Sequence, residues 1–324
     1  MNKRQKRKHK KYRIALWRAV THGNLRRTRK LLRLVNADKE ILHGAIFTRQ
    51  SRELVELVQQ SVGLSPEELK ISMLSHAVEK DDVPSVQAYL RSGMSPDTIL
   101  NEYGSRPLHC AYSGKMAQAL IAAGADVNAL NRFGEPPVFY ARREVLKVLL
   151  AAGANARIIG KFGQTALLHH HSAEDIRLLL AAGADPHRLG PGEDTPLHIA
   201  EDAESVRIYV ELGLNVNARN ILGDSPLFRA KNLEVAQALL AAGADPCAVD
   251  DEGKTPLHCC SKADIATCLI AAGAHVNAED ENGRTPLDYA LANKYQRETQ
   301  ITLIATLIKA GATRGSGIPC GGSE

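Results

Sequence analysis

The chain has 324 residues, of which 44% are hydrophobic and only 4% aromatic, and its formal net charge at pH 7 is +5. The hydrophobic share is ordinary for a folded soluble protein, and a core so poor in rings must be built from Leu, Ile, Val and Ala. No run approaches the roughly 18 consecutive apolar residues of a membrane span, so the sequence excludes a long membrane-spanning helix.

The six cysteines form no CxxC pair and no spacing that resembles a disulfide framework. We therefore expect reduced thiols in a reducing compartment. The apolar stretch at residues 14–20 is interrupted by Arg18 and is too short for the core of a signal peptide. These features predict a cytoplasmic location, with the nucleus, or secretion as an effector delivered into a host cell, as alternatives.

The start of the chain is strongly basic. Residues 1–37 contain 14 Lys or Arg and no Asp or Glu, which leaves 27 basic and 36 acidic residues, a balance of −9, in the remaining 287. We expect residues 1–13 to be disordered because like charges repel. They could bind nucleic acid, an anionic membrane surface or an import receptor, or only solubilise the chain. The candidate basic-patch residues are Lys3, Arg4, Lys6, Arg7, Lys8, Lys10, Lys11 and Arg13.

Residues 14–99 contain weak copies of a unit that is clearer further along the chain. The pattern Ala-Leu-Trp-Arg-Ala at residues 15–19, followed by Leu31 and Leu32, predicts a first, capping unit. The segments 42–63 and 74–93 predict two divergent units. A second basic cluster at residues 26–33 would lie on the exposed second helix of the first unit.

Residues 100–278 contain a regular repeat. The phrase Ala-Ala-Gly-Ala and its variants place glycines at positions 124, 153, 183, 213, 243 and 273, which are 29 or 30 residues apart. A second phrase, Thr-Pro-Leu-His, occurs at residues 195–198 and 255–258 and keeps step with the first. Self-similarity at a fixed period predicts a solenoid, in which each unit buries its apolar face against its neighbours.

Each phrase has a place in the unit. Thr195 before Pro196 predicts a helix start, where the hydroxyl caps a free N–H and the proline loses no hydrogen bond. A second helix, such as residues 206–212, ends at Gly213, for which we expect a positive φ. A tight turn with another glycine, such as Gly223, follows. The unit is therefore expected to be helix, helix and projecting hairpin, and the fold class all-α.

This pattern resembles the ankyrin repeat, D-x-x-G-x-T-P-L-H-x-A followed by x-x-L-L-x-x-G-A-x-x-N, most specifically over residues 100–290. The resemblance implies an ankyrin-repeat solenoid of about ten units. The period is 30 residues instead of about 33, and the missing residues fall between the two helices, which predicts short first helices. The last glycine interval is 38 residues, so residues 279–313 are expected to form a C-terminal cap, and 314–324 a disordered tail.

The resemblance implies that proteins bind at the hairpin tips and on the concave face of the first helices. The residue before the hairpin glycine is aromatic in three consecutive units, Tyr103, Phe133 and Phe162, and is Leu222 further on. These side chains could form an apolar stripe that binds a partner, or each ring could pack on the neighbouring hairpin. An irregular stretch puts Glu193 in the place of one hairpin glycine.

On the concave face, one position of the first helix varies from unit to unit, and Tyr140 occupies it in the second regular unit. The variation fits either a tuned binding surface or a position under little constraint. Arg142 and Arg143 follow closely and could meet a carboxylate or phosphate, although a solvated face explains them equally simply.

The sequence contains no signature of catalysis or of a metal site. The adjacent histidines at 169–171 point about 100° apart on a helix and cannot converge on one ion; His170 is expected to be packed. Residues 258–268 lack the ligand spacing of a zinc site, and their cysteines are expected to be buried thiols. The family resemblance implies a structural role for His198 and His258, with hydrogen bonds between turns. We expect no enzyme activity, cofactor or metal.

These observations predict a non-catalytic scaffold that binds a partner protein through the hairpin tips and the concave face. The alternative is a binder of nucleic acid or of an anionic membrane surface that acts through residues 1–13. No small-molecule substrate is expected, and the sequence does not identify the partner.

Overall fold

The computed structural model describes residues 15–16, 19, 24–32, 65–292 and 297–316. The chain divides into two compact units, residues 1–132 and 133–324. The predicted disordered segment 1–13 and the predicted repeat at 42–63 lie outside the described residues and stay predictions. The described part of the chain is all-α and contains no strand, as the sequence predicted.

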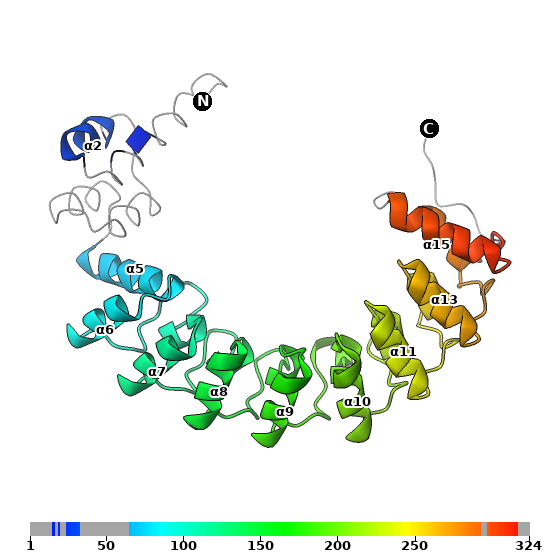
Figure 1. Ribbon diagram of the computed structural model, residues 1–324, viewed down its shortest axis with the longest axis horizontal. Helices are drawn as coiled ribbons and strands as arrows, with labels where there is room; N and C mark the ends of the chain where they lie inside the picture. The colour runs from blue at the N-terminus through cyan, green and yellow to red at the C-terminus, as the bar shows by residue number, and fades with distance from the viewer. Residues whose placement is uncertain (1–14, 17–18, 20–23, 33–64, 293–296, 317–324) are drawn as a thin grey trace. The chain divides into compact units, whose positions relative to one another are not determined.

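The first unit contains four α-helices and one 3-10 helix among its described residues. They are α2 (Leu25–Leu32), α5 (Pro66–Glu79), α6 (Val83–Arg91), η1 (Pro107–Cys110) and α7 (Gly114–Ala122). Helix α5 contacts both α6 and η1, and α6 contacts α7, so the helices form consecutive pairs (Figure 1). The capping box between Ser65 and Glu68 fixes the start of α5.

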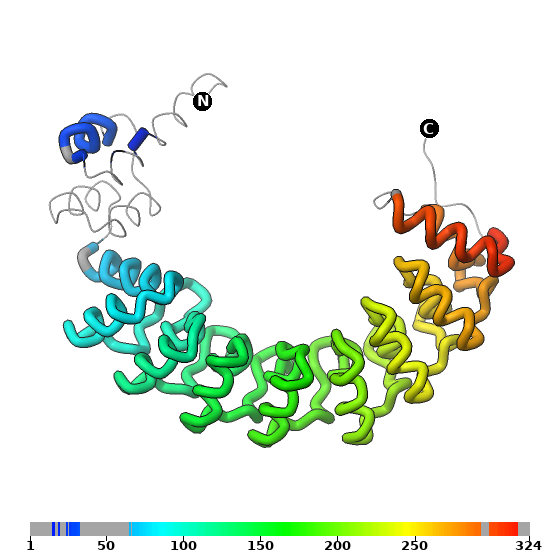
Figure 2. Tube along the Cα trace, in the orientation of Figure 1, coloured from blue at the N-terminus to red at the C-terminus, as the bar shows by residue number. Residues whose placement is uncertain are grey.

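The second unit continues the pairs with shorter first helices. Its elements are η2 (Pro137–Phe139), α8 (Arg143–Ala151), η3 (Ala166–Leu168), α9 (Ala173–Ala181), η4 (Pro191–Glu193), η5 (Pro196–Ile199), α10 (Ala203–Glu211), η6 (Pro226–Arg229), α11 (Leu233–Ala241), α12 (Pro256–Cys259), α13 (Ala263–Ala271), α14 (Pro286–Ala292) and α15 (Arg297–Lys309). Consecutive second helices contact each other, and so do consecutive first helices, as the trace in Figure 2 shows. The number of about ten repeats stays a prediction, because residues 33–64 are not described.

The second helices of the repeats supply most of the core, and they share the same hydrogen-bonding pattern at their C-terminal ends. In α8, Leu146 and Leu149 are fully buried, and the corresponding positions of the later second helices are buried too. The N–H of Gly153 bonds to the carbonyl of Leu150, and that of Ala154 to Leu149, a Schellman motif that satisfies the last carbonyls. Gly153 has φ 88°, which confirms the expected positive φ at the glycine that ends the helix.

The first helices of the 30-residue units are single turns of three or four residues, as the missing residues predicted. In the T-P-L-H phrase a capping box forms, in which an imidazole cap adds to the expected hydroxyl cap. His198 Nδ1 accepts a hydrogen bond from the backbone N–H of Thr195 at 3.1 Å, and the Thr195 hydroxyl lies 2.9 Å from the same nitrogen. The ring thus caps the N–H of the first residue of the phrase, whereas a threonine hydroxyl in this place caps an N–H two or three residues further on.

The same imidazoles join neighbouring repeats. His198 Nε2 lies 3.0 Å from the carbonyl of Asp224, and His258 Nε2 lies 3.0 Å from the carbonyl of Arg284. Because Nδ1 accepts a hydrogen bond, each ring must be neutral with its proton on Nε2. Burial lowers the pKa of His198 and His258 below the ordinary value, which keeps both rings in this form. The structural role implied for these histidines is confirmed.

These histidines make the stability of the second unit pH-dependent. Their folded-state pKa is lower than in the unfolded chain, so below about pH 6.5 the unfolded chain binds more protons and is favoured. We expect the thermal midpoint to fall between about pH 7 and about pH 5. In a His198→Asn/His258→Asn variant the fall should be smaller, because the amide oxygen can accept from the threonine N–H, as Asp288 does from Thr285. Circular dichroism melts at both pH values check this. An equal fall of the thermal midpoint in the variant and in the unchanged protein would contradict the assignment.

Candidate protein-binding surface

The hairpins are held by side chains at their first residue. Asn220 Oδ1 accepts hydrogen bonds from the backbone N–H groups of Leu222 and Asp224, at 2.9 and 3.0 Å. Gly223 has φ 77°, and a Cβ there would lie 2.7 Å from the backbone nitrogen of Asp251 in the next hairpin. The turn therefore needs glycine both for its conformation and for the close approach of its neighbour.

Neighbouring hairpins are joined by one backbone hydrogen bond each. In the second unit the N–H of Lys161 bonds to the carbonyl of Phe133 at 2.8 Å, and the N–H of Asp251 bonds to Leu222 at 3.1 Å. The equivalent bond to the Phe162 carbonyl is missing, because the residue that would donate it is Pro191. The row of hairpins is thus continuous except at one junction.

The hairpin after this junction is irregular. Glu193 has φ 62°, and its N–H bonds to the carbonyl of Gly190 at 3.0 Å, the bond that glycine makes in the other hairpins. This confirms that Glu193 stands in the glycine's place. The residue before it is Gly192, so this hairpin carries no side chain at the position that Phe162 and Leu222 occupy in the others.

The candidate side chains of the hairpins are exposed. The exposed fraction is 38% for Phe133, 62% for Phe162 and 58% for Leu222. The rings of Phe133 and Phe162 lie 6.4 Å apart between centroids, so both interpretations of the aromatic residues hold in part: the rings pack on each other and still face solvent. Tyr103 is 53% exposed but belongs to the first unit, and the predicted continuous stripe of three rings stays a prediction.

Sequence reasoning missed three further apolar side chains of this region. Ile159, Leu189 and Ile221 are all exposed, the first two directly before the turn and the third directly after its first residue. Together with Phe133, Phe162 and Leu222 they form what we call the hairpin surface. The sequence signal that could have identified them is the recurrence of an apolar residue directly before the turn of successive hairpins. In the next hairpin Val249 is still exposed before the turn, but the tips of this and the following hairpin carry the exposed acidic residues Asp251, Glu252, Glu279 and Glu281.

The candidates on the first helices have different surroundings. Tyr140 is exposed, and its ring meets that of His169 edge-on at 4.7 Å. Partial burial and a hydrogen bond to Glu135 raise the pKa of Tyr140 to about 12. Arg142 is exposed at the start of α8. Tyr140 therefore remains the side chain here that offers a partner both a ring and a hydroxyl.

Arg143 is occupied within the solenoid. Its guanidinium contacts Glu174 at 2.7 Å and Asp175 at 3.0 Å, and it donates a hydrogen bond to the Ser172 hydroxyl at 3.0 Å. These contacts tie α8 to the start of α9. The guanidinium thus already has carboxylates around it, and the geometry favours a role between repeats over the binding of an external anion.

The described histidines and cysteines are not gathered into a site. The expectation of buried cysteines at residues 258–268 was wrong, because Cys259 is exposed and Cys260 and Cys268 are half-buried. His170 is buried and its Nε2 lies 2.9 Å from the carbonyl of Val138. Burial raises the pKa of the Cys259 and Cys260 thiols to about 11, so both are protonated at neutral pH and are poor nucleophiles or metal ligands. Among the described residues no group of three or more His, Cys, Asp or Glu is placed to hold a metal ion.

The basic-patch candidates between Lys3 and Arg13 lie outside the described residues. The second basic cluster is described in part: Arg26, Arg27, Arg29 and Lys30 are exposed on α2, as expected for the outer helix of a first repeat. In the described part of the chain no helix is long and apolar enough to span a membrane.

The paired helices, the Schellman ends and the linked hairpins define a helical-repeat solenoid built from one recurring unit. A family model of three ankyrin repeats matches residues 227–313, and a model of a single ankyrin repeat matches residues 103–132. Residues 103–132 and 227–313 are therefore ankyrin repeats. Ankyrin repeats generally mediate protein–protein interaction. No curated protein matches this chain.

The strained hairpin gives a test of the turn geometry. A side chain in the left-handed region costs about 1 kcal/mol, so Glu193→Gly should raise the free energy of unfolding by about 0.5–1 kcal/mol after the greater flexibility of unfolded glycine is allowed for. Glu193→Ala keeps the Cβ and the strain and serves as the control. Urea unfolding of both variants checks this, and an equal effect of glycine and alanine would show that the turn is unstrained.

Proposed function

We propose that this chain is a non-catalytic scaffold that binds a partner protein through the hairpin surface. The observation that carries the proposal is the run of six exposed apolar side chains on consecutive hairpins of the second unit. Contiguous exposed apolar area of this kind is typical of interaction surfaces, and aromatic side chains are enriched in them. The backbone beneath is held by the turn and inter-hairpin hydrogen bonds, so little conformational entropy is lost on binding.

The surroundings of the hairpin surface indicate which partner fits. The apolar side chains give way to the acidic tips Asp251, Glu252, Glu279 and Glu281. A partner with an apolar patch beside Lys or Arg would meet both regions, because a charged rim steers and orients association. The carbonyl of Phe162, whose hairpin bond Pro191 cannot supply, offers such a partner a backbone hydrogen-bond acceptor within the apolar area. A reducing compartment such as the cytoplasm fits the five free cysteines of the described residues.

The proposal predicts the effect of making the hairpin surface polar. A Phe162→Ser/Ile221→Ser/Leu222→Ser variant should lose the bound protein, with a decrease in affinity of at least about tenfold, because anchoring side chains of this kind contribute about 1–2 kcal/mol each. The matched control is Ile301→Ser/Ile308→Ser, which removes equally exposed apolar side chains from α15. Both are used as bait in native lysate, with retained proteins identified by mass spectrometry.

Two outcomes would contradict the hairpin surface as the binding site. One is that the hairpin variant retains the same proteins as the unchanged chain. The other is that the α15 control loses them to the same degree. Tyr140→Ser, tested in parallel, reports separately on the first-helix face.

A second function is supported by the exposed cations of α2. The alternative is an electrostatic binder of nucleic acid that uses residues 1–13 together with Arg26, Arg27 and Lys30. Phosphate contacts release counterions, so affinity for a labelled duplex should fall steeply as salt rises. Replacing Arg26, Arg27 and Lys30 with glutamine should weaken binding and flatten the salt dependence. Fluorescence anisotropy measures the affinity and its salt dependence. An affinity that changes neither with salt nor with the three substitutions would rule this function out.

A further inference from the structure

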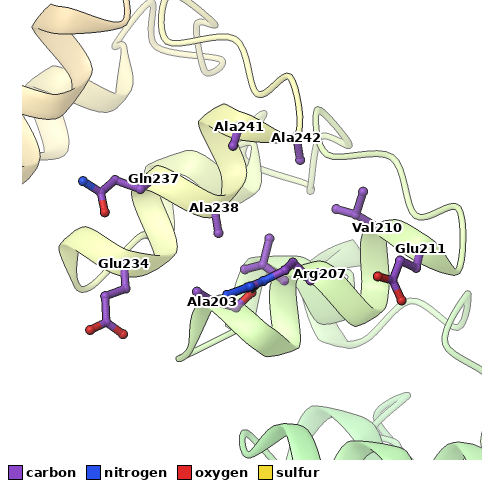
Figure 3. Close-up of a pocket in the computed structure, with 10 residues that line it drawn as sticks. Ala203, Arg207, Val210, Glu211, Glu234, Gln237, Ala238, Ala241 and Ala242 are labelled. Carbon is purple, nitrogen blue, oxygen red and sulfur yellow. Dashed lines mark hydrogen bonds between the residues drawn. The ribbon is translucent and has the colours of Figure 1, made fainter.

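A groove lies between α10 and α11, on the layer of second helices and away from the hairpin surface. Its volume is about 700 Å³, which is in the range of ligand-binding clefts. Val210 of α10 and Ala238 and Ala241 of α11 give it an apolar lining, Arg207 of α10 lines it too, and Glu211 and Glu234 lie on its rim (Figure 3). Neither the hairpins nor the first helices contribute a side chain to it.

The groove exists because the residue at one of the two facing positions is small. Each second helix of the 30-residue units has nine residues, and the eighth residue of one helix faces the sixth of the next. At the other junctions of the second unit these pairs are Leu150 with Leu178, Leu180 with Ile208 and Leu240 with Cys268. Between α10 and α11 the pair is Val210 with Ala238. The core positions are kept, since Val206 and Leu239 are fully buried, so only the outer layer is hollowed.

The rim of the groove carries two unpaired carboxylates. At the earlier junctions the fifth residue of one helix pairs with the second of the next: Lys147 contacts Glu174 at 3.3 Å, and Arg177 contacts Glu204. The third pair of this kind would be Arg207 with Glu234.

Arg207 contacts Glu204 of its own helix instead, at 3.5 Å. Glu234 is left on one side of the groove. Glu211 lies on the other side, at a position that is alanine in α8, α9, α11 and α13. Within the described residues neither Glu211 nor Glu234 makes an ion pair.

The spacing of these carboxylates matches one kind of ligand. Glu234 is the second residue of its helix and Glu211 the ninth of the neighbouring one, and stacked repeats run in the same direction. Seven helical residues advance about 10 Å along the helix axes, and neighbouring helices lie about 8–10 Å apart, so the two carboxylates stand diagonally across the groove. The long side chains of Lys or Arg at i and i+7 of a helix that crosses the groove can reach both. The residues at i+3 and i+4 lie between them on the same face.

We propose that the groove between α10 and α11 binds a helical segment of a partner protein that carries Lys or Arg at i and i+7 and an aliphatic side chain at i+3 or i+4. The cations pair with Glu234 and Glu211, and the aliphatic side chain fills the space over Ala238. A helix laid into an apolar groove is a recurring mode of recognition. The proposal does not rest on the hairpin surface.

The first unit contains a groove of the same origin with the opposite charge. It has a volume of about 560 Å³ and lies between α6 and α7, where the sixth residue of the second helix is again alanine, Ala119. The positions that correspond to Glu211 and Glu234 are Arg91 and Lys115. If rim charge selects the ligand, a basic helix should be rejected by this groove. It is therefore a matched internal control.

The test uses a labelled, stapled helical peptide with Lys at i and i+7 and Leu at i+3 and i+4, and a second peptide with Glu in place of Lys. Ala238→Leu should weaken binding of the Lys peptide at least tenfold by filling the groove, whereas Ala119→Leu should leave it unchanged. Leu178 stands at the equivalent position of α9, so leucine is compatible with the fold, and a circular dichroism melt checks this. Glu211→Lys/Glu234→Lys, which alters only exposed groups, should weaken the Lys peptide about fivefold and favour the Glu peptide.

Several outcomes would overturn the proposal. One is that Ala238→Leu binds the Lys peptide as tightly as the unchanged chain does, and another is that Ala119→Leu weakens this binding as much as Ala238→Leu does. The others are that the unchanged chain binds the two peptides with equal affinity, or that the anisotropy does not change at about 1 mM peptide. The Phe162→Ser/Ile221→Ser/Leu222→Ser variant should bind the Lys peptide normally. Its result separates failure of the groove from failure of the hairpin surface.

Discussion

The contact on which the second unit depends is the one between a repeat and the next. No single pair of short helices can bury its apolar face alone, so leucines such as Leu149 and Leu239 are buried only because another repeat covers them. The imidazoles of His198 and His258 add a polar link across the same interface. A first helix of one turn is stable in this setting because its ends are satisfied by its own histidine and its neighbour, not by its length.

The sequence was sufficient for the parts of the fold that follow from period and turn chemistry. The paired helices, the positive φ of Gly153 and its equivalents, the short first helices and the place of Glu193 were all predicted from spacing. The cap of the Thr-Pro-Leu-His phrase was predicted only in part: the threonine hydroxyl was expected as a cap, but the return bond from the backbone N–H of Thr195 to the ring of His198 was not.

The candidate site was predictable only in part. The exposure of Phe162 and Leu222 followed from their place directly before the hairpin glycine. The exposure of Ile159, Leu189 and Ile221 could be recognised only when the hairpins were compared side by side in the structure. Arg143 could not be assigned from sequence, since its partners Glu174 and Asp175 lie in the next repeat. The break at Pro191 is readable in the sequence once the hydrogen bond between hairpins is known, because a proline cannot donate it.

In this repeat the residues that stabilise the stack and the residues that form the binding surface are different positions, more completely so than in a globular protein. In the second helices α8 to α13 the fourth and seventh residues are buried, as Val206 and Tyr209 are in α10, and they set the stacking. The sixth and eighth residues are less buried in most of these helices, so an alanine at the sixth, as in α7 and α11, opens a groove without a cavity in the core. A cavity would cost several kcal/mol, whereas an open groove is filled by water. Variation at these outer positions can therefore change what a repeat binds while the stack beneath it stays the same.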